Sequence, residues 1–358
     1  MPSLKEIKGR INSISSTLAI TSAMKMVASA KLQKAQMAIQ NMLPYERRLY
    51  SMLLDLMGAM NISAAASEDG SVRGSGSAER GFDQSGDRLS LSNRHDLAGM
   101  DGAYSLMAQR EVRKVAIVAF ASNSSLCGAF NSNVIREATA VINEYRASGL
   151  RDSDIVVYSV GRKMAEAMRK LGFPSPADFT KMSDSPSYEA ASALAQELLD
   201  GFVSGRFDKV ELVYNHYKST SSQPTTRQTY LPLSLADAIA DLQAGKIADS
   251  ASESDTNRGA EPVGAPVVRQ GSPTTEDLIV EPSKEALIAT LLPKVIRLRI
   301  FTTLLDSAAA EHAARTVAMQ LATDNGNDLL QELTLEYNKG RQQKITSEIL
   351  DLVGGSMQ

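Results

Sequence analysis

Hydrophobic residues at the start of the chain recur in steps of three and four positions. This spacing is a heptad repeat, in which a helix buries one narrow stripe against a partner helix. The repeat predicts a single helix from about Ser3 to about Met60, roughly 85 Å long at 1.5 Å per residue. Pro44 lies inside it and predicts a bend rather than an end. The stripe consists of Leu4, Ile7, Ile11, Ile14, Leu18, Ala28, Leu32, Ala35, Ile39, Met42, Leu49, Leu53, Leu56 and Met60.

A second helical pattern occupies the other end of the chain. It runs from about Ser283 to Val353, and only Pro293, Gly326 and Gly340 interrupt it. Such a helix would be on the order of 100 Å long. Two rods at opposite ends of one chain predict an antiparallel coiled coil, with the middle of the chain attached to its side.

The middle of the chain alternates short apolar runs with helical patterns. Continuous apolar runs are typical of strands that are buried on both faces. The alternation predicts an open α/β sheet of Rossmann-like build. The expected strands cover 112–121, 155–160, 209–214 and 229–233, with an edge strand at 278–280, and the expected helices cover 129–145, 162–171 and 188–203.

Two polar stretches separate these parts, at 61–108 and at about 244–275. They contain too few large apolar residues to offset the entropy of ordering, so we expect flexible insertions. The first contains His95, which has no second ligand type at a useful spacing for a metal. The predicted organisation is an N-terminal coiled-coil helix at 1–60, an insertion at 61–108, a Rossmann-like domain at 109–282 and a C-terminal coiled-coil helix at 283–358.

Composition narrows the function classes. The 358 residues carry a net charge of only -3, which gives no argument for nucleic acid or an acidic substrate. The single cysteine, Cys127, excludes an internal disulfide and fits a reducing compartment. No signal-peptide pattern opens the sequence, and no apolar run approaches the ~20 residues needed to span a bilayer. We expect a protein that is soluble or sits at a membrane only through partners.

Basic residues dominate positions 5–48 of the first helix and are opposed there only by Glu6 and Glu46. Two interpretations stay open at this point. The basic side chains either form a solvated face or contact acidic groups of a surrounding socket. The residues are Lys5, Lys8, Arg10, Lys25, Lys31, Lys34, Arg47 and Arg48.

The sequence offers little for chemistry. The loop at 122–128 joins a strand to a helix, where Rossmann-like sheets bind phosphates. It contains one glycine, Gly128, and neither glycine-rich phosphate motif. Cys127 has no histidine near it in sequence, and His216 and His312 are isolated, so we interpret all three as structural. We therefore predict no catalytic residue, no cofactor and no metal site in this chain.

The last helix ends in a polar belt followed by an apolar tip. The belt is the run NKGRQQK at 338–344, and the mainly apolar tip covers 349–357. The belt is either a solvated interval or a set of contacts to a surrounding protein, for which Arg and Gln supply several directed donors. In water the exposed apolar tip would favour association with other molecules, whereas a surrounding protein would cover it and could move against it as a bearing.

Six blocks of the sequence are distinctive: 4–14 (LKEIKGRINSI), 20–28 (ITSAMKMVA) with Lys31 and Leu32, 125–131 (SLCGAFN), 311–315 (EHAAR), 333–342 (LTLEYNKGRQ) and 345–349 (ITSEI). These blocks resemble the gamma subunit of F-type ATP synthases. They appear in family order and bracket nearly the whole chain except the two insertions. Three positions of the central block depart from the usual Ser-Asp-Arg-Gly-Leu-Cys-Gly, since Asn123, Ser124 and Ser125 replace its charged and glycine positions. Ala310 stands where a serine is usual, and Gly340 replaces an alanine at a cost of roughly 0.5–1 kcal/mol in helix propensity.

The resemblance implies a central rotor shaft without covalent chemistry of its own. It would pass through a ring of alternating alpha and beta subunits and rest on epsilon and the c-ring, at the cytoplasmic face of the bacterial inner membrane. Rotation would then impose conformational changes on the catalytic beta subunits. The resemblance implies ring contacts at Met24, Lys25, Arg341, Gln342, Thr346, Glu348, Ile349 and Leu352, with acidic loops facing Lys8, Arg10, Lys31 and Lys34.

Other classes fit less well. A Rossmann-type enzyme requires a phosphate loop with more glycines. A basic rod that binds nucleic acid does not need an apolar tip. A coiled-coil structural adaptor unrelated to ATP synthesis explains the two rods but neither the ordered blocks nor the belt and tip, and it remains the alternative.

Overall fold

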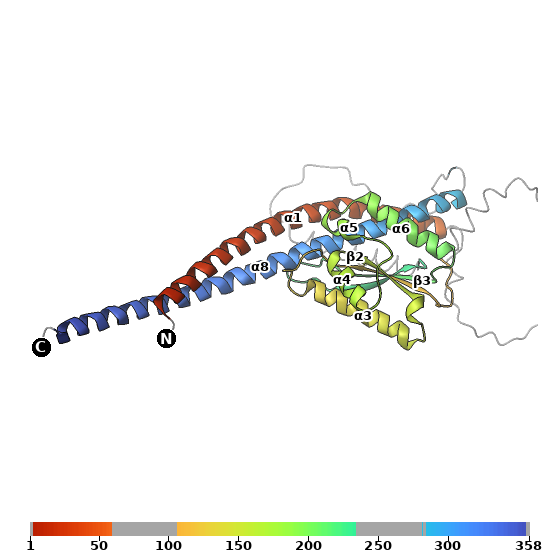
Figure 1. Ribbon diagram of the computed structural model, residues 1–358. Helices are drawn as coiled ribbons and strands as arrows, with labels where there is room; N and C mark the ends of the chain where they lie inside the picture. Colours follow the sequence, from red (N-terminus) through yellow and green to blue (C-terminus); the bar gives the residue numbers. More distant parts are fainter. Residues whose placement is uncertain (1–2, 59–105, 234–280, 282–283, 356–358) are drawn as a thin grey trace, which may run out of the picture.

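The computed structural model describes residues 3–58, 106–233, 281 and 284–355. Two long helices, α1 (Leu4–Gly58) and α8 (Lys284–Gly355), lie side by side as a shaft, and an α/β domain flanks one end of it (Figure 1). This confirms the predicted combination of terminal coiled coil and Rossmann-like domain. Each helix continues through its internal proline, Pro44 or Pro293. His95 and the expected edge strand at 278–280 lie outside the described residues.

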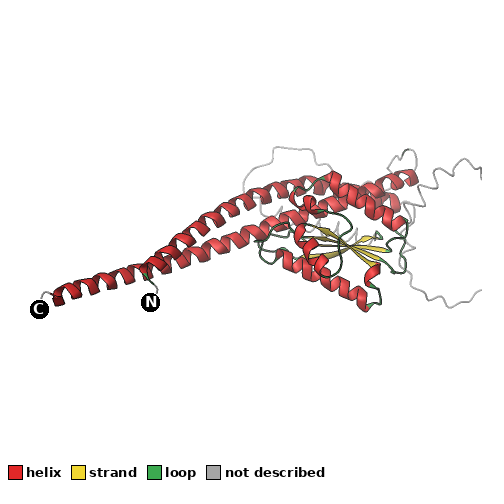
Figure 2. Cartoon of the chain, in the orientation of Figure 1, coloured by secondary structure: helices red, strands yellow, loops and turns green. Residues whose placement is uncertain are grey.

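Between the long helices the chain alternates strands and helices, as Figure 2 shows. The elements are β1 (Val115–Phe120), α3 (Phe130–Ala147), the 3-10 turn η3 (Asp152–Asp154), β2 (Ile155–Val160), α4 (Arg162–Lys170), α5 (Thr180–Asp184), α6 (Tyr188–Val203), β3 (Lys209–Asn215) and β4 (Thr225–Leu231). Two details differ from the sequence prediction. The short helix α5 was not expected, and the last strand begins four residues before the predicted 229.

The sheet has four strands in the order β2-β1-β3-β4. The central strand β1 pairs parallel with both β2 and β3, and β4 pairs antiparallel with β3. Every residue of β1 is buried, which explains why this strand appears in the sequence as an unbroken apolar run. The edge strand β4 is half-buried over its first five residues, so its polar start gave no such pattern.

Two hydrophobic layers cover the two faces of the sheet. On one face, α3 and α4 pack through Val134, Ile142 and Met164. On the other face, α6 packs together with the end of α1 and the start of α8, through side chains such as Leu53 and Ile296. The base of the shaft is therefore part of the core of the α/β domain.

Beyond the α/β domain, the two helices pack against each other along an antiparallel seam. The hydroxyl of Thr323 donates to that of Thr21 at 3.1 Å. One turn further along α8, a side chain at Gly326 would place its Cβ 2.6 Å from Leu18 Cδ2. Glycine at 326 therefore permits the close approach of α1 at this level. The predicted stripe on α1 faces this seam, since Ile7, Ala28 and Leu32 are among its buried residues.

Candidate partner-binding surfaces of the shaft

The tip of α8 extends beyond the start of α1 as a single helix (Figure 1). Leu4 of the first turn of α1 lies against Gly340, so residues 345–355 of α8 have no helix beside them among the described residues. Large apolar side chains on this segment face solvent, with Leu352 exposed by 75%. Others with substantial exposure are Ile345, Ile349, Leu350 and Val353.

The polar belt is equally accessible. The side chains of Arg341, Gln342, Thr346 and Glu348 are all exposed. Lys344 and Glu348 form an i,i+4 pair at 3.7 Å, in which both side chains are about two-thirds exposed. Pairs of this kind contribute little to stability, about 0.5 kcal/mol or less. The belt is therefore free of strong contacts within the chain's own described part and is open to a partner.

The structure separates the predicted ring contacts into two levels. Met24 and Lys25 on α1 are half-buried near the level at which Thr21 meets Thr323. Arg341 lies 18 residues further along α8 than Thr323, which corresponds to about 27 Å at 1.5 Å per residue. The residues expected to act together as one belt thus lie at two heights on the shaft.

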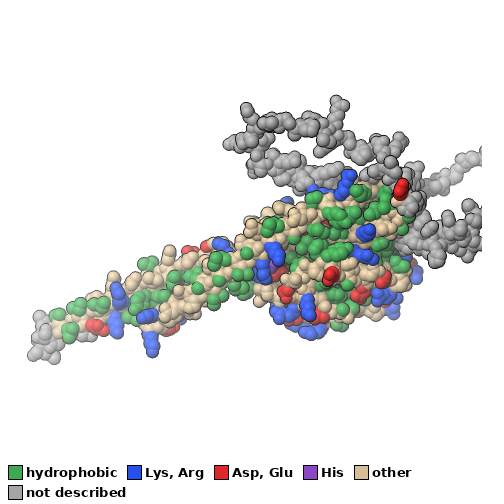
Figure 3. Space-filling model, turned by 90° about the horizontal axis from the view of Figure 1, so that it is seen from above, with side chains coloured by type: hydrophobic (Ala, Val, Ile, Leu, Met, Phe, Trp, Pro, Cys, Tyr) green, Lys and Arg blue, Asp and Glu red, His purple; other side chains and the backbone are tan. Residues whose placement is uncertain are grey.

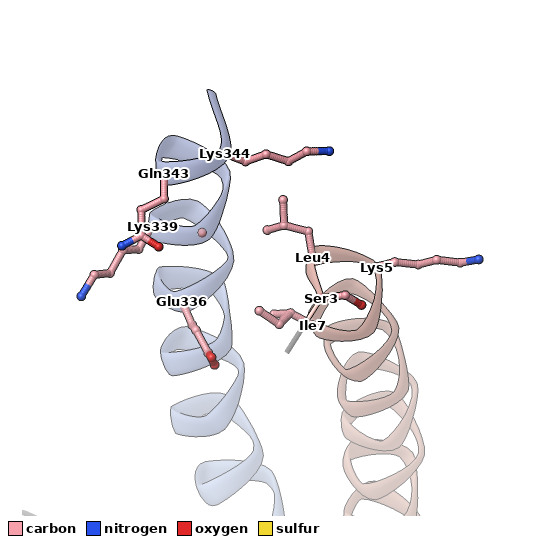
Figure 4. A pocket seen from close by; sticks show the side chains of 9 residues that line it. Ser3, Leu4, Lys5, Ile7, Glu336, Lys339, Gln343 and Lys344 are labelled. Carbon is pink, nitrogen blue, oxygen red and sulfur yellow. The ribbon is translucent and has the colours of Figure 1, made fainter. Parts of the chain in front are cut away.

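A cavity of about 620 Å³ opens where the first turn of α1 meets α8. Leu4 and Ile7 point from α1 toward α8 and form its apolar wall (Figure 4). Lys344 extends above Leu4, and Lys5 points away from the cavity. The fork between the helices therefore combines an apolar interior with a basic rim, which suits an acidic or polar segment with an apolar anchor.

The four basic residues predicted to form a face of α1 are exposed, but they do not form one continuous patch. Lys8 and Arg10 lie near the tip, and Arg10 is paired with Glu6 at 2.9 Å. Lys31 and Lys34 lie near the α/β domain, more than 20 residues further along the helix. Figure 3 likewise shows basic side chains scattered along the shaft between hydrophobic ones.

The loop after β1, considered above as a phosphate position, is bound to the start of α4. The backbone N–H of Arg162, at the start of α4, donates to Asn123 Oδ1 at 2.7 Å, and that of Lys163 donates to the carbonyl of Ser122. The Arg162 guanidinium donates to the carbonyl of Asn123. The first N–H groups of α4 are therefore occupied by the loop after β1, whereas α3, the helix that follows this loop, has no side-chain cap.

The described residues contain few other side chains suited to chemistry, and the one cysteine is buried and hydrogen-bonded. Cys127 is buried, with its Sγ accepting a hydrogen bond from Asn131 Nδ2 at 3.2 Å. Within 3–58, 106–233 and 284–355, no three His, Cys, Asp or Glu side chains group closely enough to hold a metal ion. None of the helices in these ranges is both long and apolar enough to cross a membrane.

The pKa values of the two histidines near the shaft are shifted in opposite directions. Nδ1 of His216 lies 2.6 Å from Asp306 Oδ2, and this hydrogen bond raises the pKa of His216. Burial lowers the pKa of His312 to about 4, and the charges of Arg315 and Lys31 act in the same direction. His216 therefore gains a proton easily, whereas His312 stays neutral in the folded chain.

The pair of His216 and Asp306 makes the attachment of the α/β domain to α8 pH-dependent. Because the folded pKa of His216 lies above its ordinary value of 6.5, the stabilisation is complete below about pH 6.5 and is lost as the pH rises through the folded value. We expect His216→Gln to lower the free energy of unfolding by up to about 1 kcal/mol at pH 6 and by less at pH 8.5. Urea unfolding at both pH values measures this, and a difference that does not change with pH would contradict it.

Sequence analysis missed the residues that attach the domain to the shaft. Asp306 accepts hydrogen bonds from the loop after β3, and Arg315 donates to Ser124 Oγ at 2.7 Å in the loop after β1. In each contact the two residues are far apart in the sequence, so no spacing pattern indicated the contact. The sequence contained one indication of these contacts, because Asp306 and Arg315 are charged residues among apolar ones in α8.

Comparison with known proteins gives a consistent result. A family model described as ATP synthase matches residues 3–357. An ATP synthase gamma chain of Phocaeicola vulgatus is 47% identical over 357 residues, with 100% of both chains covered. The ATP synthase gamma chain of Bacteroides thetaiotaomicron is 45% identical over 358 residues, again with 100% of both covered. A chain in the cryo-EM structure of the Euglena gracilis mitochondrial ATP synthase (OSCP/F1/c-ring, rotational state 3) shares the fold, with 18% identity, a TM-score of 0.52 and 99% and 93% of the two chains covered.

The fold and its exposed tip define a shaft protein, a long antiparallel helix pair that carries a small α/β domain at its base. The chain belongs to the ATP synthase gamma chain family. It is thus a non-catalytic subunit that acts as the central rotor shaft. The alternative of an adaptor outside ATP synthesis has no support.

Proposed function

We propose that the belt and tip of α8, together with Met24 and Lys25, are the surface through which this shaft acts on its ring of alpha and beta subunits. The observation that carries the proposal is the exposed end of α8, where large apolar side chains such as Ile349, Leu350 and Leu352 face solvent on one short helical segment. Such a surface is unfavourable in water and is stabilised when a partner covers it. Arg341, Gln342, Thr346 and Glu348 lie beside it and supply directed hydrogen bonds.

The shape of the shaft supplies a mechanism. A pair of helices has no threefold symmetry, so three equivalent subunits around it contact three different surfaces. Each surface stabilises a different conformation of the subunit that it touches, because a contact shifts a conformational equilibrium only by its difference in affinity for the two states. Rotation of the shaft then moves each subunit through the conformations in turn. The shaft transmits work, and the chemistry of ATP takes place in the catalytic subunits.

We infer the remaining surfaces from the resemblance to gamma chains. We place the α/β domain and the base of the helices on epsilon and the c-ring, opposite the tip. Acidic loops of the ring face Lys8, Arg10, Lys31 and Lys34, which are exposed at two heights of α1. In this assembly the subunit is peripheral and lies at the cytoplasmic face of the inner membrane. The four-part division at residues 60, 108 and 282 separates the shaft helices, the first insertion and the α/β domain.

The belt is tested by a double substitution, Arg341→Ala with Gln342→Ala, in the full chain assembled with its alpha and beta subunits. Charge-assisted hydrogen bonds of about 1.5 kcal/mol correspond to a change of roughly tenfold. We therefore expect the ATP hydrolysis rate of the assembled complex to fall by roughly tenfold, while the complex still forms.

The matched control is Arg169→Ala, which removes an exposed arginine near the end of α4, far from the tip. The control should hydrolyse ATP at the rate of the unsubstituted complex. Equal rates for the double variant and the control would remove the belt from the contact surface.

A further inference from the structure

Two loops grip the shaft where it leaves the α/β domain. One follows β1 and covers 121–129, and the other follows β3 and covers 216–224. We propose that these loops form a collar that fixes the shaft against twisting, and that Tyr217 is the main positioning residue of the collar. The inference rests on the proposed function, because a collar of this kind matters only for a shaft that transmits torque.

Tyr217 contacts both helices of the shaft. Its backbone N–H donates to Asp306 Oδ1 on α8 at 2.8 Å. Its hydroxyl accepts a hydrogen bond from Gln36 Nε2 on α1 at 2.6 Å. One loop residue thus joins the domain to α1 and α8 at the same height.

The ring of Tyr217 also fills the space between the shaft and the other loop. It packs against the small cluster of Leu32 and Ala309, in which the two shaft helices meet. It also packs against Cys127 and Phe130, which lie in the other loop and at the start of α3. Removing the ring therefore loosens both loops at once.

The loop after β1 is fixed to α8 by Arg315, whose guanidinium is held in place by a buried ion pair within that helix. Arg315 Nη1 donates to Glu311 Oε1 at 2.7 Å, and Arg315 Nη2 donates to Ser124 Oγ at 2.7 Å. Both charged residues are less than 10% exposed. The two loops are joined near their roots, where Asn215 Nδ2 donates to the carbonyl of Phe130 at 3.1 Å. The collar is therefore one connected structure around one side of the shaft.

The collar shortens the part of the shaft that is free to twist. The core of the sheet holds α8 up to about Leu304, and the collar extends this hold to Arg315. From Arg341 in the belt, the free segment is 26 residues long with the collar and 37 residues long without it. At 1.5 Å per residue these lengths are about 39 Å and about 56 Å. Because the torsional compliance of a uniform rod grows in proportion to its length, loss of the collar raises it by roughly 1.4-fold.

A single-molecule rotation measurement tests the collar. The full chain is assembled with its alpha and beta subunits, the ring is immobilised, and a rod-shaped probe is attached to the α/β domain through Lys170→Cys on its surface. The angular variance of the probe while the complex waits for ATP reports the compliance of the shaft. We expect Tyr217→Ala with Ser124→Ala to increase this variance by roughly 1.4-fold.

A matched control removes the same two residue types away from the collar, by Tyr188→Ala with Ser153→Ala. Tyr188 contacts Phe301 of α8 where the sheet already holds the shaft, so the variance should not change. Tyr217→Phe with Ser124→Ala keeps the ring packing and should give an intermediate variance, which a general loss of folding would not produce. If the alanine variant does not assemble, the variant with Tyr217→Phe and Ser124→Ala still tests the collar.

The outcomes separate the two proposals. Rotation with an unchanged variance in the conservative variant would overturn the collar and leave the rotor function intact. A complex whose unsubstituted shaft does not rotate would instead overturn the rotor function. A variance that increases equally in the control variant would also overturn the collar, because the effect would not be specific to the two loops.

Discussion

Alanine at Gly161 should prevent the α/β domain from folding, whereas alanine at Gly149 should leave it folded. Gly161 joins β2 to α4 with φ +94, and a Cβ there would lie 2.1 Å from the carbonyl oxygen of Ala121. That carbonyl belongs to backbone that is itself fixed, because the N–H of Ala121 donates to the carbonyl of Val160 at 2.8 Å. Neither side can move without breaking the sheet, so we expect a loss of more than about 4 kcal/mol.

Gly149 provides a matched control at the same backbone angle. Its φ is also +94, but nothing lies within 4 Å of the position that its Cβ would take. Alanine there meets only the backbone strain, about 1–2 kcal/mol. Circular dichroism during urea unfolding measures both variants. Equal losses at the two glycines would show that backbone strain, and not the contact with Ala121, sets the requirement at Gly161.

Glutamine at Glu211 should cost about 3 kcal/mol, the largest effect that we expect from a substitution without a steric clash. The carboxylate of Glu211 is buried between β3 and α3, where it accepts hydrogen bonds from Tyr145 at 2.6 Å and Arg227 at 2.7 Å. Lys209 lies 2.7 Å from it. Neutralising the carboxylate leaves the half-buried cation of Lys209 without its counter-charge, and leaves Arg227 with only the exposed carboxylate of Glu144.

The stability that Glu211→Gln removes should depend on pH, because the Glu211 carboxylate titrates with a shifted pKa. Burial alone raises the pKa of Glu211, but hydrogen bonds from Arg227, Lys209 and Tyr145 outweigh it, so the pKa lies below its ordinary value of 4.5. A depressed pKa contributes stability that is present above about pH 4.5 and is lost as the pH falls through the folded value. The difference between Glu211→Gln and the unsubstituted chain should therefore be full at pH 7 and shrink in acid.

Glu166→Gln is the control for this prediction, because Glu166 is 42% exposed and its nearest basic atoms lie 3.7 Å and 3.9 Å away. Such a surface carboxylate should contribute less than about 1 kcal/mol. Urea unfolding at pH 7 compares the two variants. A Glu211→Gln variant as stable as the control would mean that the buried cluster contributes no net stability.

The fold could be predicted to the extent that burial leaves a periodic pattern. The heptad stripe through Ile7 and Leu32 and the continuous apolar run of β1 both report surfaces that the folded chain buries. The helix α5 has only five residues, too few for a period, and β4 is polar where it lies at the sheet edge. These elements depend on their neighbours rather than on their own sequence.

The partner-binding surfaces could be predicted only in part. The run from Arg341 to Leu352 indicated an exposed polar belt followed by an apolar tip, because the sequence changes abruptly there from polar to mainly apolar residues. The sequence did not place Met24 at a different height from Arg341. Spacing along each helix does not fix the register between two helices, which here depends on contacts such as that of Leu18 with Gly326.

The collar could not be predicted at all. Tyr217 and Asp306 are 89 residues apart, and one of them lies in a loop without any periodicity. The three-dimensional structure brings them together because β3 ends beside α8. A single sequence can mark such a contact by a charged residue among apolar ones, as at Asp306, but it does not identify the partner.

The measurement that tests the shaft assignment most directly is reconstitution of this chain with its alpha and beta subunits. Size exclusion and an ATP hydrolysis assay compare the full chain with a truncation after Lys339, which removes the belt and the tip, and with a control truncation after Gly355. We expect one copy of the full chain per ring, and a loss of both complex stability and hydrolysis only for the truncation after Lys339. A chain that stays apart from the ring, or that joins it equally well without belt and tip, would contradict the assignment.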